Sequence, residues 1–178
     1  MTGLIFTIGH STRPLEEFLH LLQVHGITLL ADVRKIPRSR RYPHYNSEAL
    51  ATTLENAGIA YRWLPELGGR RPLSENSLNA GWKNHSFRAY ADYMQTPAFA
   101  EGLNKFLREA AGRRAALMCA EAVPWRCHRS LIADALMARG MTVQDILSAT
   151  RAVPHTLPLF AEVQAARVIY PAPPPQTP

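Results

Sequence analysis

Short apolar runs alternate with segments of helical periodicity along most of the chain. Runs rich in β-forming residues predict five strands, at residues 4–8, 28–33, 59–64, 115–119 and 141–147. Apolar residues at helical spacing predict the helices between them. Strands that alternate with helices are typical of a parallel sheet. We therefore expect an α/β fold: a single domain with a mostly parallel sheet of about five strands and helices on both faces.

The pattern also predicts how the chain is divided. The α/β domain is expected over residues 1–150, with a C-terminal extension over residues 151–170 that packs on it and holds one more short helix. The Pro-rich residues 171–178 suit neither a helix nor a central strand, so we expect a disordered tail. A long segment from residue 65 to about residue 86 has little regular pattern, and such a loop is often a lid over a functional site or else is partly disordered.

Polar and reactive side chains follow four of the expected strands at the point where each strand ends. These clusters are His10, residues 34–41, residues 66–71 and residues 119–129. Parallel strands end at one edge of a sheet, where α/β proteins usually bind their ligands. The sequence therefore predicts a functional site at this edge.

Both cysteines of the chain lie in the last cluster. Cys127 falls at the expected start of a helix, beside Arg126, His128 and Arg129. A helix N-terminus and neighbouring positive charges lower a thiol pKa, so Cys127 is the expected catalytic nucleophile. The alternative is a small packing or capping residue. Cys119 ends an apolar strand and is either a buried core thiol or a second catalytic thiol facing the same edge.

The remaining site residues are expected to move protons or bind an anion. Glu121 and His128 are the candidate acid–base residues. An arginine presents a planar fork of donors that suits phosphate or carboxylate. For Glu121 and Glu66, a structural ion pair with Arg34 or Arg129 is the alternative. The expected substrate-binding residues are His10, Arg34, Arg38, Glu66, Tyr90, Trp125 and Arg129.

Several familiar site types are not indicated. The chain has no Walker loop and no GxGxxG motif. A cysteine phosphatase loop fits poorly, because Arg126 comes one residue late after Cys119 and Pro124 removes a backbone donor. No compact Cys/His spacing supports a metal site. We therefore expect neither a metal nor a cofactor.

Composition narrows the choice of partner and compartment. The 178 residues carry 20 Lys and Arg against 14 Asp and Glu, a formal charge of +6. This excess suits an anionic small molecule or a nucleic acid. Two cysteines do not make a secreted disulfide framework, and no apolar run or leader suggests a membrane. We expect a cytoplasmic protein with reduced thiols, and the oligomeric state stays open.

The motifs at these positions resemble a bacterial family catalogued as domain of unknown function 488. The matching stretches are TIGHSTR at residues 7–13, DVRKIPRSRR at 32–41, LPELGGRR at 64–71, FRAYADYMQTPAF at 87–99 and ALMCAEAVPWRCHRSLIADAL at 116–136. The last is long and specific. The resemblance implies a compact α/β domain and names no reaction, so expectations of function depend on the residues.

Three hypotheses of function follow. The first is an enzyme with a cysteine-centred site that acts on an anionic substrate, a cysteine-dependent transferase or hydrolase. The second is a module that binds or processes nucleic acid through the basic residues 34–41. The third is a protein that binds an anion without turnover.

Overall fold

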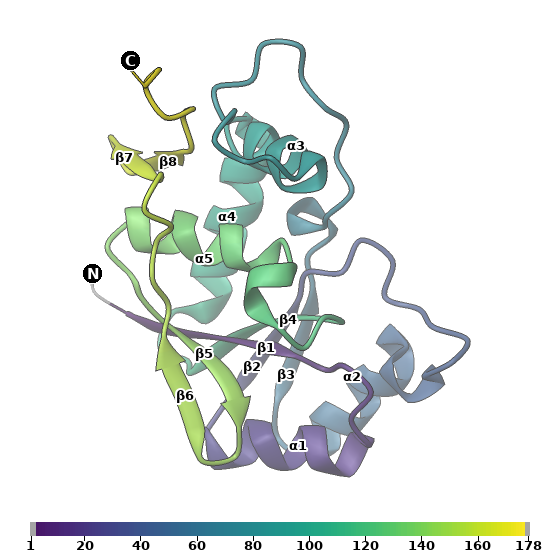
Figure 1. Cartoon of the computed structure of the whole chain (residues 1–178). Coiled ribbons are helices and arrows are strands. Elements are labelled where there is room, and N and C mark those ends of the chain that lie inside the picture. The colour runs from purple at the N-terminus through teal and green to yellow at the C-terminus, as the bar shows by residue number, and fades with distance from the viewer. Residues whose placement is uncertain (1–2, 177–178) are drawn as a thin grey trace.

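The computed structural model describes residues 3–176 and is built around a six-stranded sheet (Figure 1). The strand order is β3-β2-β4-β1-β5-β6. The pairs among the first five strands are parallel, and β6 runs antiparallel to β5. The expected fold is confirmed, and this sheet has one strand more than predicted. The strands are β1 (Leu4–Gly9), β2 (Leu29–Asp32), β3 (Ala60–Trp63), β4 (Ala115–Cys119), β5 (Thr142–Ser148) and β6 (Arg151–Pro154).

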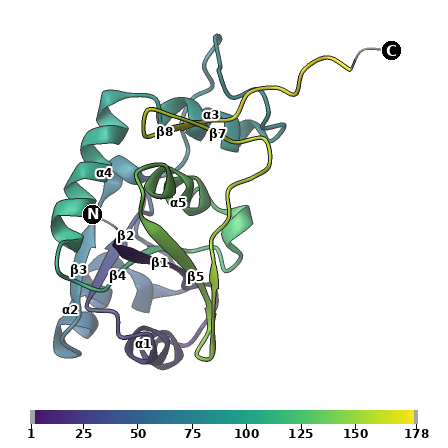
Figure 2. The same cartoon turned by 90° about the vertical axis from the view of Figure 1, so that its left-hand side faces the viewer.

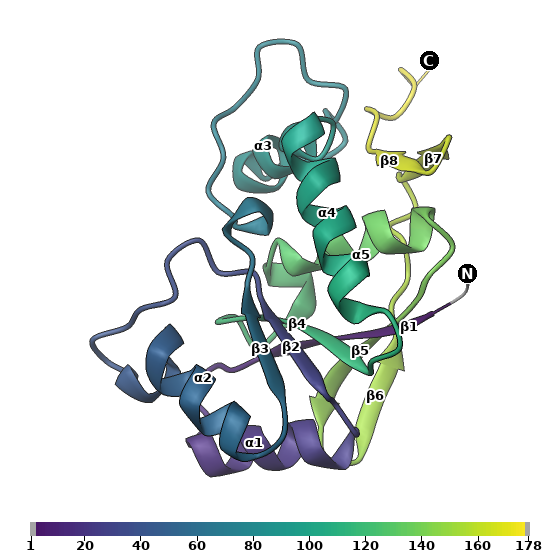
Figure 3. The ribbon, with the colours of Figure 1, turned by 180° about the vertical axis from the view of Figure 1, so that it is seen from behind.

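Helices cover both faces of the sheet (Figure 3). One face packs on α1 (Leu15–Val24) and α2 (Ser47–Asn56), and the other on α3 (His85–Tyr93), α4 (Pro97–Ala110) and α5 (Arg129–Ala138). Successive side chains of a strand point to opposite faces. In β4, Leu117 and Cys119 therefore pack with α3 to α5, whereas Ala116 and Met118 pack with α1 and α2.

Three strands are followed, before the next helix of the chain, by a short 3-10 helix that starts at a proline. These are η1 (Pro43–Tyr45) after β2, η2 (Pro65–Leu67) after β3 and η3 (Pro124–Arg126) after β4. Proline suits the first position of a helix because it has no N–H to leave unpaired there. These turns redirect the chain at the edge where the polar clusters lie.

The C-terminal extension differs from the expectation. The short helix expected within residues 158–168 is wrong, because β7 (Glu162–Gln164) and β8 (Arg167–Ile169) form an antiparallel hairpin (Figure 2). Ala165 and Ala166 turn it with φ of 48° and 63°, and Val163 pairs with Val168 as β-branched residues favour. Residues 171–176 form no helix or strand, and the last two residues of the expected tail lie outside the described part.

The long segment between η2 and α3 has no helix or strand over residues 68–84 but is fastened at its middle. Asn79 is fully buried there, donating to Asp92 Oδ1 at 2.8 Å and accepting from the backbone of Tyr170 at 3.0 Å. Its role as a lid stays a prediction. Within residues 3–176, no helix is both long enough and apolar enough to cross a membrane.

Candidate functional site

The ends of β1, β2 and β4 lie side by side at one edge, as the sequence predicts. Gly9 pairs with Cys119 and Asp32 with Met118 in the parallel register. The loop after β4 then folds back against β1. A Cβ on Gly9 would lie 1.8 Å from the carbonyl oxygen of Glu121, so this close approach requires glycine.

Arg129 fixes that loop and contacts a sulfur. It begins α5 and is fully buried. Its Nη1 donates to Cys119 Sγ at 2.8 Å and to the carbonyl of Glu121, and its Nη2 donates to the carbonyl of Ala122 at 3.1 Å. Burial alone would raise the pKa of Cys119, but a hydrogen bond from Cys127 and the Arg129 charge outweigh it and lower the pKa to about 7. The direction of this shift favours the thiolate form of Cys119.

The expected low pKa of Cys127 is wrong. Its thiol is hydrogen-bonded to the Cys119 sulfur and is buried, and both effects raise its pKa. The Arg129 backbone N–H donates to Cys127 Sγ at 3.5 Å, a long contact that does not reverse the shift. The two pKa shifts have opposite directions, so a single negative charge on the pair is favoured on Cys119, with Cys127 as the protonated thiol.

His128 faces Cys127 from the other side. Its Nε2 lies 2.9 Å from the carbonyl oxygen of Val33, which can only accept, so Nε2 carries the hydrogen. Its Nδ1 lone pair then lies 3.6 Å from Cys127 Sγ, where it competes with the Cys119 sulfur for the single thiol hydrogen. Burial lowers the pKa of His128 to about 4, so the ring is neutral at neutral pH and is a weak base.

A cavity of about 630 Å³ opens beside the two thiols. It is lined by both cysteines, His128 and the buried Tyr90. Phe87 and Ile36 add apolar side chains to its wall. A smaller hollow of about 380 Å³ shares part of this wall and reaches His10. The basic residues of the larger cavity are Arg34, Lys35, Arg38, Arg70 and Arg126. The cavity therefore suits an anion that has a small apolar part.

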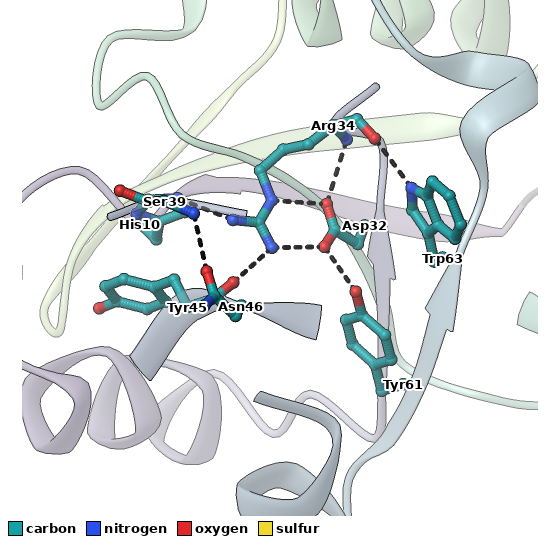
Figure 4. A network of polar contacts seen from close by, with 8 residues as sticks. All are labelled: His10, Asp32, Arg34, Ser39, Tyr45, Asn46, Tyr61 and Trp63. Carbon is teal, nitrogen blue, oxygen red and sulfur yellow. Dashed lines mark hydrogen bonds and ion pairs between the residues drawn. The ribbon is translucent and has the colours of Figure 1, made fainter. Parts of the chain in front are cut away.

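Arg34 is held by an ion pair at the end of β2 (Figure 4). Its Nε and Nη2 donate to Asp32 at 2.9 and 2.6 Å, and the Tyr61 hydroxyl donates to the same carboxylate at 2.6 Å. Nη1 lies 3.4 Å from Nε2 of His10, whose ring stacks on Tyr45 at 4.0 Å. Burial lowers the pKa of His10 to about 4. Asp32 is thus a satisfied structural carboxylate that orients Arg34.

The structure brings most of the predicted site residues together. Seven of them line the larger cavity: Cys119, Glu121, Cys127, His128, Arg34, Arg38 and Tyr90. Glu121 and Arg38 are exposed and border both hollows, while His10 borders only the smaller one. Their convergence agrees with the expected edge of the sheet.

Three predicted substrate-binding residues lie elsewhere. Glu66 pairs with Lys105 at 3.1 Å, because its place on η2 turns it toward α4. Trp125 is 68% exposed and borders a different hollow, since η3 carries it away from the thiols. Arg129 is fully buried, so its guanidinium contacts Cys119 and the loop and is not part of the cavity wall.

Other lining residues were not singled out from the sequence. Arg70 and Arg126 lie in the predicted clusters, so their charge was a usable signal. Ser86 and Phe87 reach the cavity from the start of α3, and nothing in the local pattern indicates this. Among the residues that the structure describes, no group of three or more His, Cys, Asp or Glu side chains could hold a metal ion.

Comparison with known proteins gives one family. The family described as a domain of unknown function, DUF488, matches residues 14–136. This range holds both cysteines, Arg34, α3, α4 and most of α5, and leaves out β1, β5 and β6. No curated protein and no solved structure matches the chain.

Proposed function

The chain belongs to the DUF488 family, and from that premise we propose that it is an enzyme in which the Cys119 thiolate attacks an electrophilic centre of an anionic substrate. The observation that carries this proposal is the contact of Arg129 and Cys127 with one sulfur. A guanidinium at 2.8 Å and a neighbouring thiol donor lower the pKa of Cys119 to about 7. A thiolate that forms at neutral pH is the reactive form of cysteine.

The neighbouring thiol supplies the proton transfers. As the Cys119 sulfur forms a bond to the electrophilic atom, the bond to the leaving group breaks and the leaving group takes the electron pair. Cys127 gives it a proton, with the neutral His128 holding the Cys127 side chain at 3.6 Å. Water, in a hydrolase, or an acceptor hydroxyl, in a transferase, then displaces the sulfur and returns a proton to Cys127. Cys119 leaves as the thiolate, and no external oxidant or reductant is used.

The basic residues of the cavity define the substrate class. Lys35, Arg38, Arg70 and Arg126 are exposed in the wall of the cavity that holds the thiols, and Arg34, whose guanidinium is held by Asp32, lines the same cavity. This favours a small substrate that carries phosphate, sulfate or carboxylate. A cytoplasmic location, which we include in the proposal, would keep both thiols reduced.

The charge of an alkylating reagent tests this proposal. Iodoacetate is anionic and iodoacetamide is neutral. The rate of alkylation of Cys119 by iodoacetate, divided by its rate with iodoacetamide, therefore reports how strongly the positive charges of the cavity attract an anion. We expect this ratio to exceed that of reduced glutathione at the same pH and to fall with added salt. Arg38→Ala should lower the ratio, whereas Arg41→Ala, a matched control outside the cavity wall, should leave it unchanged. A wild-type ratio equal to that of glutathione would contradict an anion-directed site.

The exposed basic loop after β2 favours a nucleic-acid substrate as the second candidate. Arg38, Arg40 and Arg41 lie exposed together, next to the cavity. Binding of a fluorescent single-stranded oligonucleotide should then weaken steeply with salt and survive Cys119→Ser. Binding without any turnover would identify a non-catalytic anion-binding protein, and binding that ignores salt would exclude the nucleic-acid function.

A further inference from the structure

Hydrogen bonds continue from the cysteine site into the far half of the sheet. The Nε of Arg129 donates to Thr7 Oγ1 at 3.2 Å, and the Thr7 hydroxyl donates to Asp145 Oδ1. Thr7 is fully buried on β1 and Asp145 is 5% exposed on β5. A hydroxyl has one hydrogen, so its donation to Asp145 turns an oxygen lone pair toward Arg129. The carboxylate thereby sets the direction of the guanidinium.

Asp145 is itself held by a histidine. His155, directly after β6, lies with Nδ1 at 2.9 Å from Asp145 Oδ2 and with Nε2 at 2.7 Å from Asp134 Oδ1. Tyr170, directly after β8, donates to Asp134 Oδ2 at 2.6 Å. Both ring nitrogens face carboxylate oxygens, which accept hydrogen bonds, so the protonated ring satisfies both contacts.

We propose that His155 is a positioning residue of the cysteine site, which holds Asp145 so that the Thr7 hydroxyl aligns Arg129 with Cys119. The inference builds on the proposed function, in which Cys119 is the nucleophile. It adds β1, β5 and the residue after β6 to the machinery of a site whose thiols lie on β4 and before α5. Thr7, Asp145 and His155 all lie outside residues 14–136 that match the family.

The charges around His155 agree with this role. The charged and titratable groups that face it are Asp134 from α5, Asp145 from β5 and, through Asp134, Tyr170 after β8. Burial alone would lower the pKa of His155, but the hydrogen bonds and charges of the two carboxylates raise it to about 9. At neutral pH the ring is therefore cationic and balances one of two buried carboxylates. Asp145 reaches Arg129 through the Thr7 hydroxyl.

A purely structural clamp is the competing explanation. His155 and Tyr170 join the C-terminal segment to α5, so their loss would lower stability in either case. If His155 positions Arg129, its loss should also change the pKa of the Cys119 thiol. A purely structural clamp predicts no such change. The pH midpoint of alkylation at Cys119, measured on the folded protein, separates the two.

Thr7 gives the closest matched pair of variants. Thr7→Val keeps the shape but removes the hydroxyl, and we expect the Cys119 midpoint to rise by about one pH unit. Thr7→Ser keeps the hydroxyl and should restore the wild-type midpoint even if it lowers stability. Circular dichroism below the melting temperature confirms that each variant is folded. A Thr7→Val protein that is folded and has an unchanged midpoint would overturn the proposal.

His155 variants test the other end of this series of hydrogen bonds, which runs from His155 through Asp145 and Thr7 to Arg129. The amide nitrogen of Asn takes the place of Nδ1 and that of Gln the place of Nε2, so His155→Asn retains the donor to Asp145 and His155→Gln does not. We expect a larger rise of the midpoint for Gln than for Asn, and none for the neighbouring control Thr156→Ala. If His155→Asn, His155→Gln and the wild-type protein all have the same Cys119 midpoint, the positioning role of His155 is overturned. If wild-type Cys119 itself has an ordinary thiol midpoint, the proposed function fails instead.

Discussion

The Nη1 of Arg129 donates to the sulfur of Cys119 at 2.8 Å and to the carbonyl of Glu121, while its Nη2 donates to the carbonyl of Ala122 in the same loop after β4. One buried side chain therefore performs two tasks. It fixes the loop that carries Glu121, and it stabilises a negative sulfur at the end of β4. The planar fork of arginine is suited to this because it offers five donors in fixed directions.

Replacing Arg129 by lysine separates charge from geometry. Lysine keeps the positive charge but cannot reach Cys119, Thr7 and the loop carbonyls together. Because the buried carbonyls lose donors, we expect the free energy of unfolding to fall by about 2 to 4 kcal/mol and the pKa of Cys119 to rise. Urea denaturation and alkylation rates measure the two effects. Wild-type stability in Arg129→Lys would show that the fork is dispensable.

Two substitutions of Cys127 test whether its hydrogen bond lowers the pKa of Cys119. Cys127→Ala removes the hydrogen bond to the Cys119 sulfur, so we expect the pKa of Cys119 to rise by about one unit. Cys127→Ser keeps an O–H donor and should retain most of the lowering. The alkylation midpoint of Cys119 in each variant is the measurement. Equal midpoints in the two variants would mean that Cys127 does not act through its hydrogen.

The stability of the fold should depend on pH in two windows. Because the pKa of His155 is raised to about 9, its contribution is complete below its ordinary pKa of 6.5 and falls as the pH rises toward 9, by up to about 3 kcal/mol. Because the pKa values of His10 and His128 are lowered to about 4, protonation of the unfolded chain should reduce stability as the pH falls from 6.5.

Unfolding by urea across these pH values tests both windows. His155→Asn should remove most of the alkaline decline and leave the acid decline intact. A wild-type protein whose stability is constant from pH 6.5 to 9 would contradict the ionised state assigned to His155.

The fold and the edge of the site could be predicted from local pattern. All five predicted strands are present, and the alternation of strands and helices gave the parallel sheet and its two covered faces. Because parallel strands end at a common edge, the polar clusters after them were expected to meet there. The convergence of Arg34, Cys119 and Cys127 on one cavity agrees with this.

Contacts between distant parts of the chain could not be predicted from the local sequence pattern. Which cysteine carries the charge depends on Arg129 and on burial, not on the helix N-terminus that favoured Cys127. Thr7 and Asp145 are 138 residues apart, and neither is unusual in its own segment. The C-terminal hairpin was missed because its short strands have little alternation, and its turn depends on left-handed Ala165 and Ala166.

The most direct test of the account is the pH dependence of alkylation at each cysteine of the native protein. Trypsin cleaves after Arg126, so Cys119 and Cys127 fall in different peptides and mass spectrometry follows each rate separately. We expect Cys119 to react faster, with a midpoint near pH 7, and Cys127 to remain slow until the solution is well above its ordinary pKa. A faster Cys127, or two thiols with ordinary midpoints, would contradict the Cys119 thiolate on which the proposed enzyme depends.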